Sequence, residues 1–578
     1  MIHRFFVSTG LLALAVLLLV GGCSNKEEEG AKAVAKFDLL ARVPADTPYV
    51  VAGSKPLPET LSKHLLQASR IKAEEDQEPM WQNLAQADLD ETPRRLLQFM
   101  HALSQELEGK QTPQGLAELG LPLSGRNLLY GLGVLPVAWV QITDGDKVNA
   151  LLDRVEKRAG LTSVAGQLQG QSYRRLTFGK LVGIFAQREG YLVAALLPDP
   201  QVDKLLPLAL GMEKPTPSLA DSGELAALSK KHGYLGYGEG YIDLVKLTEM
   251  ALGEAEGINA QVLIALGARP ADLSPGCRAL AKALVQSAPR VALGFTRVED
   301  HAYDFEMVWE TSPGVAAWLR ELAAPVPGLG AAPDAIFSLG LGLHLPKLRD
   351  GLKQFLATIA EQGKACEKVD QEALARSMQS IDMMLNPMLA GIKGFELVVE
   401  GVEVPPHGAQ PESVDGRLIV AATDPRGLFG MLGMFNPQLA MVQIPTDGTP
   451  VKLPLKDLSP QAPDAWAAIQ GEALGIFFGR QPPKAPKAEL GASPARPGVL
   501  FSLGYNVAKV FEQLKPMLEQ GLKAGNAQEV EGARALYGAL ERTAGVYERV
   551  QLDLAGGPAG LVLDGKVWFN PKTPSDTQ

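Results

Sequence analysis

Apolar and polar residues follow one another along the chain in an order that predicts strands leading into helices. From Tyr49 to Ala52 a short apolar strand is followed, beyond Pro58, by apolar residues at helical spacing. Strands show a period of two residues and helices one of about 3.6, so this change of period indicates a strand–helix unit. The same unit recurs in three later stretches, which begin at Tyr234, Phe337 and Phe501.

Repeated motifs indicate an internal duplication. The tetrapeptide Phe-Ser-Leu-Gly occurs at residues 337 and 501, and Val-Trp pairs at 308–309 and 567–568 lie in the second strands of two apolar hairpins. The offset between the proposed copies is 288 residues from Tyr49 to Phe337 and 259 residues from Trp309 to Trp568. A generic α+β chain also shows strand–helix echoes, but the shared order of these motifs favours a duplication with a shortened second copy.

Strands that alternate apolar and polar residues between short polar turns are typical of antiparallel sheets with one face in water. We therefore expect an α+β protein of two similar lobes, each a curved antiparallel sheet with helices packed on one face. The expected boundaries are 37–322 for the first lobe, 323–333 for a Pro/Gly/Ala-rich linker, 334–570 for the second lobe with a flexible insertion at 481–498, and 571–578 for a tail.

The N-terminus has the pattern of a targeting segment. Arg4 precedes an uncharged, largely apolar run over residues 5–20, which is short for a membrane span and typical of a signal peptide. The run ends in Leu-Val-Gly-Gly followed by Cys23, which resembles the lipobox of bacterial lipoproteins. The alternative is an ordinary secretory signal with an incidental cysteine.

The lipobox resemblance implies a signal peptide at residues 1–22, lipidation of Cys23 and a membrane attachment through that lipid. We expect residues 23–36 to form a polar tether. Ser24 stands where an aspartate tends to retain such proteins in the inner membrane, so family analogy favours the periplasmic face of the outer membrane.

Composition limits the classes of partner. The chain has 578 residues and a formal net charge of -10, and 46% of its residues are hydrophobic. These values are typical of a globular protein, and the acidic, unclustered charge argues against nucleic acid as a partner. They also argue against a basic surface for anionic lipid headgroups.

Two cysteines remain beyond Cys23, and an even pair in an oxidising compartment predicts a disulfide between Cys277 and Cys366. Such a bridge would connect the end of the first lobe to the start of the second. The alternative is two unrelated buried thiols. A metal site is not expected, because no CxxC motif or nearby histidine pair accompanies these cysteines.

Motifs for catalysis are incomplete. The stretch from Gly560 to Lys566 has the spacing of a phosphate-binding loop, but Val567 replaces the required hydroxyl residue. Asp144 is better explained as a helix N-cap than as a calcium ligand. The histidines are scattered and are expected at surface or turn positions. We therefore expect no catalytic residues, no cofactor and no enzymatic activity.

Methionines gather in one segment of the second half. Methionine is flexible and polarisable, so such a segment could line an adaptable apolar binding surface, although filling of the core is the simpler interpretation. The seven residues are Met378, Met383, Met384, Met388, Met431, Met434 and Met441.

A wider resemblance is carried by the sequence VPADTPYV at residues 43–50, by the strand–helix units, and by Ser218, which introduces a helix. In these features the chain resembles uncharacterised bacterial envelope lipoproteins with a domain of unknown function. The resemblance implies location and fold and transfers no active site.

The function expected from these features is that of a lipid-anchored periplasmic binding or scaffold protein, with an envelope protein or a lipid as its partner. An alternative is a carrier of apolar ligands or lipoproteins that uses a groove lined by the methionine segment. An enzyme of unrecognised type is a third reading.

Overall fold

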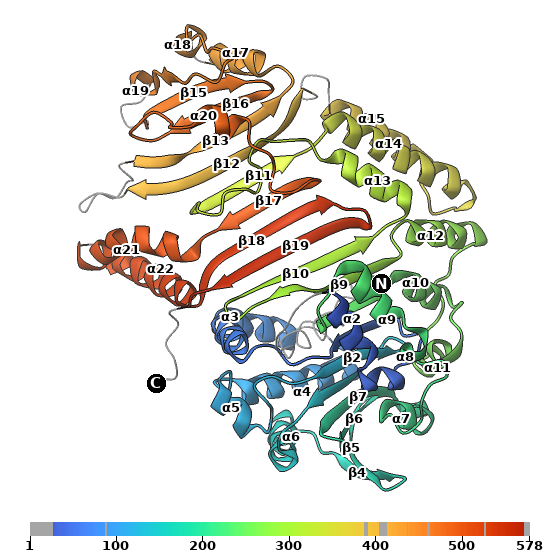
Figure 1. The fold of residues 1–578 in the computed structure, drawn as a ribbon. Helices are drawn as coiled ribbons and strands as arrows, with labels where there is room; N and C mark the ends of the chain where they lie inside the picture. The colour runs from blue at the N-terminus through green and yellow to red at the C-terminus, as the bar shows by residue number, and fades with distance from the viewer. Residues whose placement is uncertain are drawn as a thin grey trace. The chain divides into compact units, whose positions relative to one another are not determined.

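The computed structural model describes residues 27–86, 89–385, 391–403, 413–435, 437–458, 463–524 and 527–571 (Figure 1). The chain divides into two compact units. Unit 1 runs to Leu273 and includes 288–306, and unit 2 comprises 274–287 and the chain from Met307 onward. Helices and antiparallel strands are mixed in both units, which confirms the expected α+β class. The signal segment and Cys23 lie outside the described residues.

Unit 1 is built on an antiparallel sheet with the order β4-β5-β6-β7-β3-β2-β1-β8-β9. The strands are β1 (Tyr49–Gly53), β2 (Asn127–Leu132), β3 (Leu135–Gln141), β4 (Val164–Leu168), β5 (Gln171–Phe178), β6 (Leu181–Arg188), β7 (Tyr191–Pro198), β8 (Tyr237–Asp243) and β9 (Arg290–Val298). A further strand, β10 (Ala302–Glu310), forms a hairpin with β9 and contains the boundary between the units.

The helices of unit 1 connect these strands, and most are short. They are α2 (Glu27–Ala35), η3 (Asp38–Arg42), α3 (Glu59–Gln86), α4 (Glu91–Leu107), α5 (Pro113–Glu118), α6 (Gly145–Ala159), η4 (Asp199–Gln201), α7 (Val202–Ala209), α8 (Leu219–Ser222), α9 (Glu224–His232), α10 (Leu244–Leu252) and α11 (Gly257–Ala265). Helix α6 begins where the sequence predicts, because the backbone N–H groups of Asp146 and Lys147 donate to the Asp144 carboxylate at 3.0 and 3.1 Å. Gly160 ends α6 in a left-handed conformation.

Unit 2 has an antiparallel sheet with the order β14-β15-β16-β13-β12-β11-β17-β18-β19. The strands are β11 (Phe337–Gly342), β12 (Ile392–Glu403), β13 (Ser413–Ala422), β14 (Val451–Leu453), β15 (Ala465–Gln470), β16 (Ala473–Phe478), β17 (Val499–Tyr505), β18 (Tyr547–Gly556) and β19 (Gly560–Phe569). The helices are α12 (Pro275–Ser287), α13 (Pro313–Leu322), α14 (Leu345–Gln362), η5 (Gly363–Ala365), α15 (Gln371–Met384), α17 (Pro425–Phe435), α18 (Pro437–Ala440), α19 (Leu455–Leu458), α20 (Pro486–Leu490), α21 (Val507–Ala524) and α22 (Ala527–Val546).

The two strand orders correspond when the edge strand β4 is set aside and β10, which crosses the unit boundary, is counted after β9. In unit 1, β1 lies between β2 and β8. In unit 2, β11 lies between β12 and β17 in the same way. A pair of helices follows each of these first strands, α3 and α4 after β1 and α14 and α15 after β11. Trp309 and Trp568 are each the penultimate residue of the second strand of a hairpin, in β10 and β19.

Strands inside both sheets are covered on both faces. This differs from the expected sheet with one face in water. Every residue of β1 after Tyr49 is buried, and five consecutive residues of β15 are buried as well. Successive side chains of a strand point to opposite faces, so these strands have cover on each side. In unit 2, Phe429 of α17 packs with Ala467 and Leu490 of α20 packs with Ala468, its neighbour in β15.

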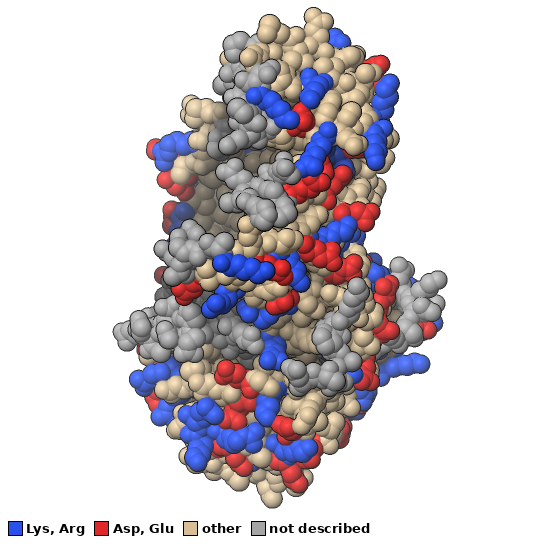
Figure 2. All heavy atoms as spheres, turned by 90° about the vertical axis from the view of Figure 1, so that its left-hand side faces the viewer, with Lys and Arg blue, Asp and Glu red and all other residues tan. Residues whose placement is uncertain are grey.

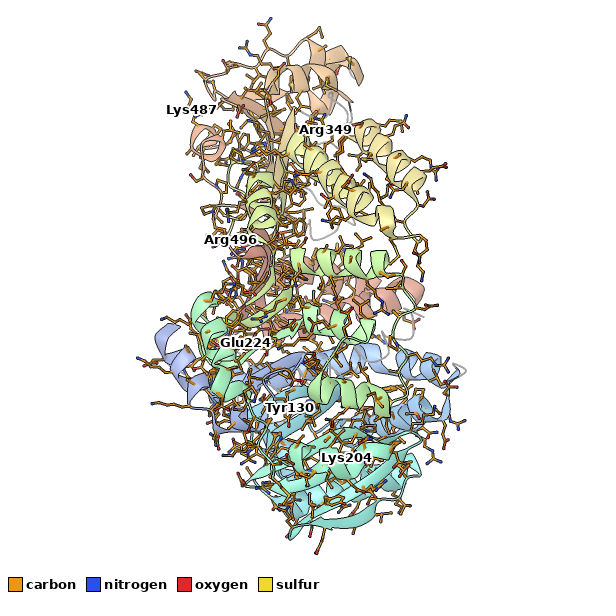
Figure 3. The ribbon with its side chains drawn as sticks, turned by 90° about the vertical axis from the view of Figure 1, so that its right-hand side faces the viewer. Tyr130, Lys204, Glu224, Arg349, Lys487 and Arg496 are labelled. Atoms are coloured by element: carbon orange, nitrogen blue, oxygen red, sulfur yellow. A yellow bond between two sulfur atoms is a disulfide. The ribbon has the colours of Figure 1, made fainter. Side chains whose placement is uncertain are left out.

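The expected linker and flexible insertion are both parts of the body of unit 2. Val326 and Leu329, in the Pro/Gly/Ala-rich stretch 323–333, are fully buried. Within 481–498, Leu490 of α20 is buried and Arg496 forms an ion pair with Asp564 at 2.7 Å (Figure 3). The prolines and glycines here lie in segments that pack on unit 2, and these segments do not act as the expected linker and insertion.

The expected tether is also shorter than predicted. Residues Glu27–Ala35 form helix α2, which packs against α9. Val34 is fully buried, and a Cβ added at Gly30 would lie 2.0 Å from the carbonyl oxygen of Tyr234. This segment therefore belongs to the fold of unit 1, because its small and apolar residues fit closely against α9 and the chain that follows it.

Candidate functional site

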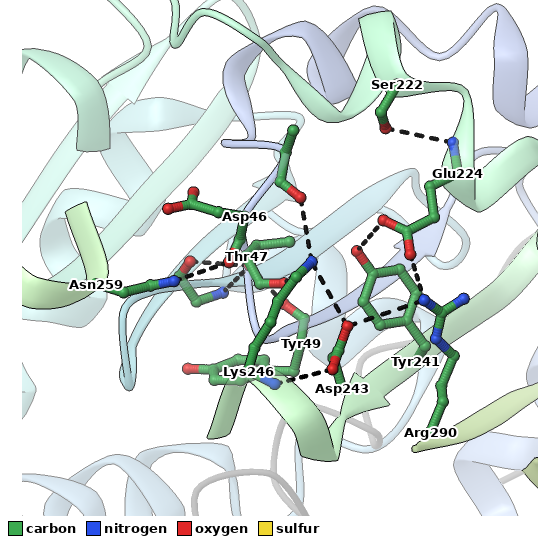
Figure 4. A network of polar contacts seen from close by, with 12 residues as sticks. Asp46, Thr47, Tyr49, Ser222, Glu224, Tyr241, Asp243, Lys246, Asn259 and Arg290 are labelled. Carbon is green, nitrogen blue, oxygen red and sulfur yellow. Dashed lines mark hydrogen bonds and ion pairs between the residues drawn. The ribbon is translucent and has the colours of Figure 1, made fainter. Parts of the chain in front are cut away.

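A network of polar side chains surrounds the loop at residues 43–48, which lies just before β1 (Figure 4). The hydroxyl oxygen of Thr47 lies 2.9 Å from the carbonyl oxygens of Tyr49 and Gly131. It also accepts a hydrogen bond from the Gly131 N–H at 3.1 Å. On the other side, the Asn259 side chain donates to the carbonyl oxygen of Asp46 at 3.0 Å.

Asp243 and Lys246 hold the same loop from the start of α10. The Asp243 carboxylate accepts the Lys246 backbone N–H at 3.0 Å and so caps the helix. The Lys246 ammonium group donates to the carbonyl oxygens of Ala45 and Thr47 at 3.2 and 3.3 Å. The backbone N–H of Asp243 donates to the carbonyl oxygen of Pro48 at 2.8 Å. We call this arrangement of Asp243 and Lys246 the cap–lysine clamp.

A second part of the network lies beside Asp243. Glu224 forms an ion pair with Arg290 and accepts a hydrogen bond from the Tyr241 hydroxyl at 3.3 Å. The Arg290 guanidinium lies 4.8 Å from the centre of the Tyr241 ring, and one of its nitrogens lies 3.8 Å from the Asp243 carboxylate. Burial raises the pKa of Tyr241 above its ordinary range, and the charge of Glu224 adds to this effect.

Unit 2 contains the same clamp at the corresponding place. Asn506 accepts the Lys509 backbone N–H at 2.9 Å, and the Lys509 ammonium group donates to the carbonyl oxygen of Asp334 at 2.7 Å. The Asn506 N–H donates to the carbonyl oxygen of Ile336 at 2.8 Å, as that of Asp243 does to Pro48. Each clamp therefore fastens the loop before the first strand to the helix after β8 or β17.

The side chains of this network hold the 43–48 loop in place. Lys246 and Arg290 face carboxylates, and the hydroxyl groups of Thr47 and Tyr241 face acceptors. Sequence reasoning singled out the 43–50 sequence but missed the residues that hold it. A signal was present, because Asp243 is the last residue of β8, Asn506 directly follows β17, and each precedes a lysine by three residues.

Each unit also buries a glutamate with a raised pKa. In unit 1, burial raises the pKa of Glu239 in β8 to about 7. The Ser229 hydroxyl and the Gly238 N–H each donate to its carboxylate at 3.2 Å and offset part of this effect. This side chain therefore holds its proton up to about neutral pH.

The buried glutamate of unit 2 is Glu396 in β12, a strand that does not correspond to β8, and its carboxylate has fewer hydrogen-bond donors. Burial raises its pKa to about 7, and the charge of Arg417 and the backbone of Gly330 lower it only in part. Neither of its carboxylate oxygens has a hydrogen-bond partner among the described residues. A Cβ added at Gly328 would lie 2.6 Å from this carboxylate, so the 323–333 stretch covers it closely.

The predicted disulfide between Cys277 and Cys366 is present, with the Cα atoms 4.4 Å apart. Its expected role as a bridge between two lobes is wrong, because both cysteines belong to unit 2. Helix α12 packs against η5 and α14 there, and a Cβ added at Gly276 would lie 1.9 Å from the Ala365 carbonyl oxygen. Glu367 lies beside the two sulfur atoms, which are joined to each other and offer no thiolate to a metal.

The described methionines of this segment are neither all buried in the core nor all gathered on one surface. Met383, Met434 and Met441 are exposed, so the core interpretation is wrong for these three. Met378 and Met431 are partly buried. Figure 1 shows α15, which carries Met378 and Met383, well apart from α17 and α18. The side chain of Met384 and the whole of Met388 lie outside the described residues.

The helix pair α14–α15 is the apolar feature of unit 2 that stands out. Both helices carry apolar side chains at helical spacing, yet no residue of α14 is buried. Phe355 of α14 is 50% exposed, and Met383 of α15 is exposed as well. We call the exposed side chains of Phe355 and Met383 the α14–α15 apolar patch.

Other sequence candidates lie in structural positions. His64 is buried, contrary to the expectation for histidines, and its Nε2 lies 2.9 Å from the Nδ1 of His301. Burial and the neighbouring His301 lower the pKa of His64. Residues Gly560–Lys566 lie within strand β19 and form no phosphate-binding loop. A small half-open hollow of about 50 Å³ in unit 1 is lined by Leu66, Leu123 and Arg126, among others.

The surface gives no single dominant charge on the face shown in Figure 2, where acidic and basic side chains interleave. Among the described residues, no helix has both the length and the apolar character needed to cross a bilayer. Comparison with known proteins finds no matching family model, no matching curated protein and no matching solved structure.

Proposed function

We propose that this protein is a lipid-anchored envelope protein that works as a non-catalytic scaffold, with the α14–α15 apolar patch as its binding surface. The observation that carries the proposal is the exposure of Phe355 and Met383 on a helix pair whose first helix buries none of its residues. An amphipathic helix that leaves its apolar residues half-covered is suited to contact with another protein. By contrast, the polar networks face inward and are used to hold loops.

A photo-crosslinking experiment tests this proposal. A benzophenone amino acid is placed at Phe355 in the full-length protein in cells, and at Val164 as a control, since Val164 is 67% exposed on an edge strand of unit 1. We expect one discrete adduct from position 355 and none from position 164. A Met383→Glu substitution should abolish the adduct, and the same background at both positions would refute the proposal.

Two similar lobes that arose by duplication are part of the proposal. The matching strand orders, the two cap–lysine clamps and the positions of Trp309 and Trp568 support it. A superposition of experimentally determined coordinates of the two units, with β1 placed on β11, tests it. Corresponding strands that fail to align would remove the duplication.

The methionines support a second candidate, a carrier of apolar ligands or lipoproteins. Met434 and Met441 are exposed near the α17–α18 turn and could contact a flexible apolar ligand. A fatty-acid or lipid probe whose binding is lost in a Met434→Gln, Met441→Gln variant would favour the carrier over the scaffold.

The membrane anchor at Cys23 is tested separately. Cells that express the protein are grown with labelled palmitate beside a Cys23→Ala variant. We expect label in the wild-type protein only, because the lipobox resemblance places the acyl chains on this cysteine. Equal labelling of the two proteins would remove the anchor from the proposal.

A further inference from the structure

We propose that the α2–α9 face of unit 1 lies against the phospholipid bilayer to which the protein is anchored. This face consists of the exposed side chains of Glu29, Lys32, Lys36, Lys230 and Lys231 on and next to helices α2 and α9. The inference rests on the proposed lipid anchor at Cys23 and goes beyond it, because it states which part of the folded protein faces the membrane.

The fixed position of α2 is the first step. A Cβ added at Gly30 would lie 2.0 Å from the Tyr234 carbonyl oxygen, and the Cβ of Ala33 lies 3.4 Å from the corresponding position at Gly236. Val34 is fully buried. The helix is therefore held on unit 1, and Glu27 is its first residue.

The length of chain before that point is the second step. Only three residues separate Cys23 from Glu27. Four Cα–Cα steps span at most about 14 Å even when fully extended, so this limit holds for any conformation of the three residues. A lipid on Cys23 thus places the start of α2 within roughly that distance of the headgroup layer, which excludes a long flexible stalk.

The charge of the face is the third step. Four of these five side chains are lysines, but α2 also carries Glu27 and Glu28 and the exposed Asp38 follows Lys36, so acidic and basic residues are mixed here. Anionic phospholipid headgroups attract lysines held within a Debye length of the surface. The lysines are able to contact anionic headgroups, and the short connection to Cys23, rather than a net positive charge, places this part of the protein near the membrane.

The strand order of unit 1 provides two positions at different expected distances from the membrane. Helix α9 packs on β8 and β9 at one end of the strand order, and β4 is the edge strand at the other end. Seven strand spacings separate β8 from β4 in the order, or about 34 Å at roughly 4.8 Å each. Figure 1 shows β4 at the far end of unit 1 from α2. Val164 in β4 is thus a matched exposed control for Lys230.

The test measures energy transfer from a dye on the protein to acceptor headgroups. The full-length lipidated protein is placed in vesicles of phosphatidylethanolamine and phosphatidylglycerol, with the dye on Lys230→Cys or Val164→Cys. We expect strong transfer from position 230 and weak transfer from position 164. A flexible insertion of about 15 Gly/Ser residues between Lys26 and Glu27 adds a mean reach of roughly 22 Å and should cause a loss of transfer at position 230.

Each outcome bears on a different part of the argument. Equal transfer from both positions, in protein whose Cys23 carries lipid by mass spectrometry, overturns the docking inference and leaves the anchor in place. Unchanged transfer after the insertion also overturns it, since tether length would then not set the position. A Cys23 without lipid overturns the anchor and this inference together.

Discussion

Cys277 is bonded to Cys366 across 89 residues of sequence, and both lie in unit 2 although β9, the next strand after Cys277, belongs to unit 1. The reason is that helix α12 packs on η5 and α14, so a short excursion of the chain joins unit 2 before the chain returns. The disulfide therefore fastens this excursion to the body of unit 2.

Removal of the disulfide should destabilise unit 2. A Cys277→Ser, Cys366→Ser variant should lose at most about 4 to 5 kcal/mol of unfolding free energy, the chain-entropy value for a loop of this length. Urea unfolding of unit 2, followed by a probe on Trp568, measures the change. Wild-type protein treated with a reductant should behave like the variant, and no difference between oxidised and reduced protein would contradict the prediction.

The buried carboxyl of Glu396 should make stability fall as pH rises. Its pKa is about 7 in the folded protein against an ordinary value of 4.5, so the folded state holds the proton more tightly. No penalty exists below about pH 4.5, and the full penalty of about 3 kcal/mol is reached above pH 7. A Glu396→Gln variant should therefore be more stable than wild type at pH 8 and similar to it at pH 4.

The matched control for this experiment is Glu512→Gln, which changes an exposed carboxyl on α21. It should leave the dependence of unfolding free energy on pH unchanged. A Glu396→Gln difference that is the same at pH 4 and pH 8 would show that packing, and not ionisation, decides the effect.

Both cap–lysine clamps should stabilise the protein, the clamp of unit 1 more than that of unit 2. Asp243→Ala and Asn506→Ala each remove a helix N-cap and should lower the unfolding free energy by about 1 kcal/mol or more. Asp243 also faces Lys246 and Arg290, so its loss should cost more than that of Asn506. Denaturant unfolding measures both values. Asp203→Ala, in the exposed first turn of α7, is the control and should change little.

The packing of α2 should depend on the absence of a side chain at Gly30. A Gly30→Ala substitution forces α2 away from Tyr234, because the added Cβ would meet its carbonyl oxygen. We expect residues 27–36 to lose protection in amide hydrogen exchange. Gly314→Ala in α13, where an added Cβ meets nothing within 4 Å, should leave exchange unchanged. Retained protection in Gly30→Ala would contradict the close fit.

Local pattern was sufficient to predict most elements. The stretches that begin at Phe337 and Phe501 each form a strand followed by a helix, β11 with α14 and β17 with α21, as the change of apolar period predicts. These features depend on near neighbours in sequence, on turn residues and on periodicity. The hairpin of β15 and β16 was missed, since five buried residues in succession give no alternation to detect.

Long-range packing could not be predicted in the same way. Nothing local to the stretch around Cys277 shows that it belongs to unit 2, because that depends on its contact with residues near Ala365. Residues 27–36 were expected to be a solvated tether for the same reason. The group that packs on Gly30 is the backbone of Tyr234, which is distant in sequence. The loops that Lys246 and Lys509 hold could not be predicted, because their carbonyl acceptors are distant along the chain.

The excursion at 274–287 also means that no single cut in the sequence yields two whole units. A fragment that ends at Leu273 lacks strand β9 as well as helix α12, and one that begins at Met307 lacks the helix that carries Cys277. A chain that emerges amino end first exposes α12 well before Cys366 is available. A splice at one position in the sequence therefore cannot exchange either unit whole.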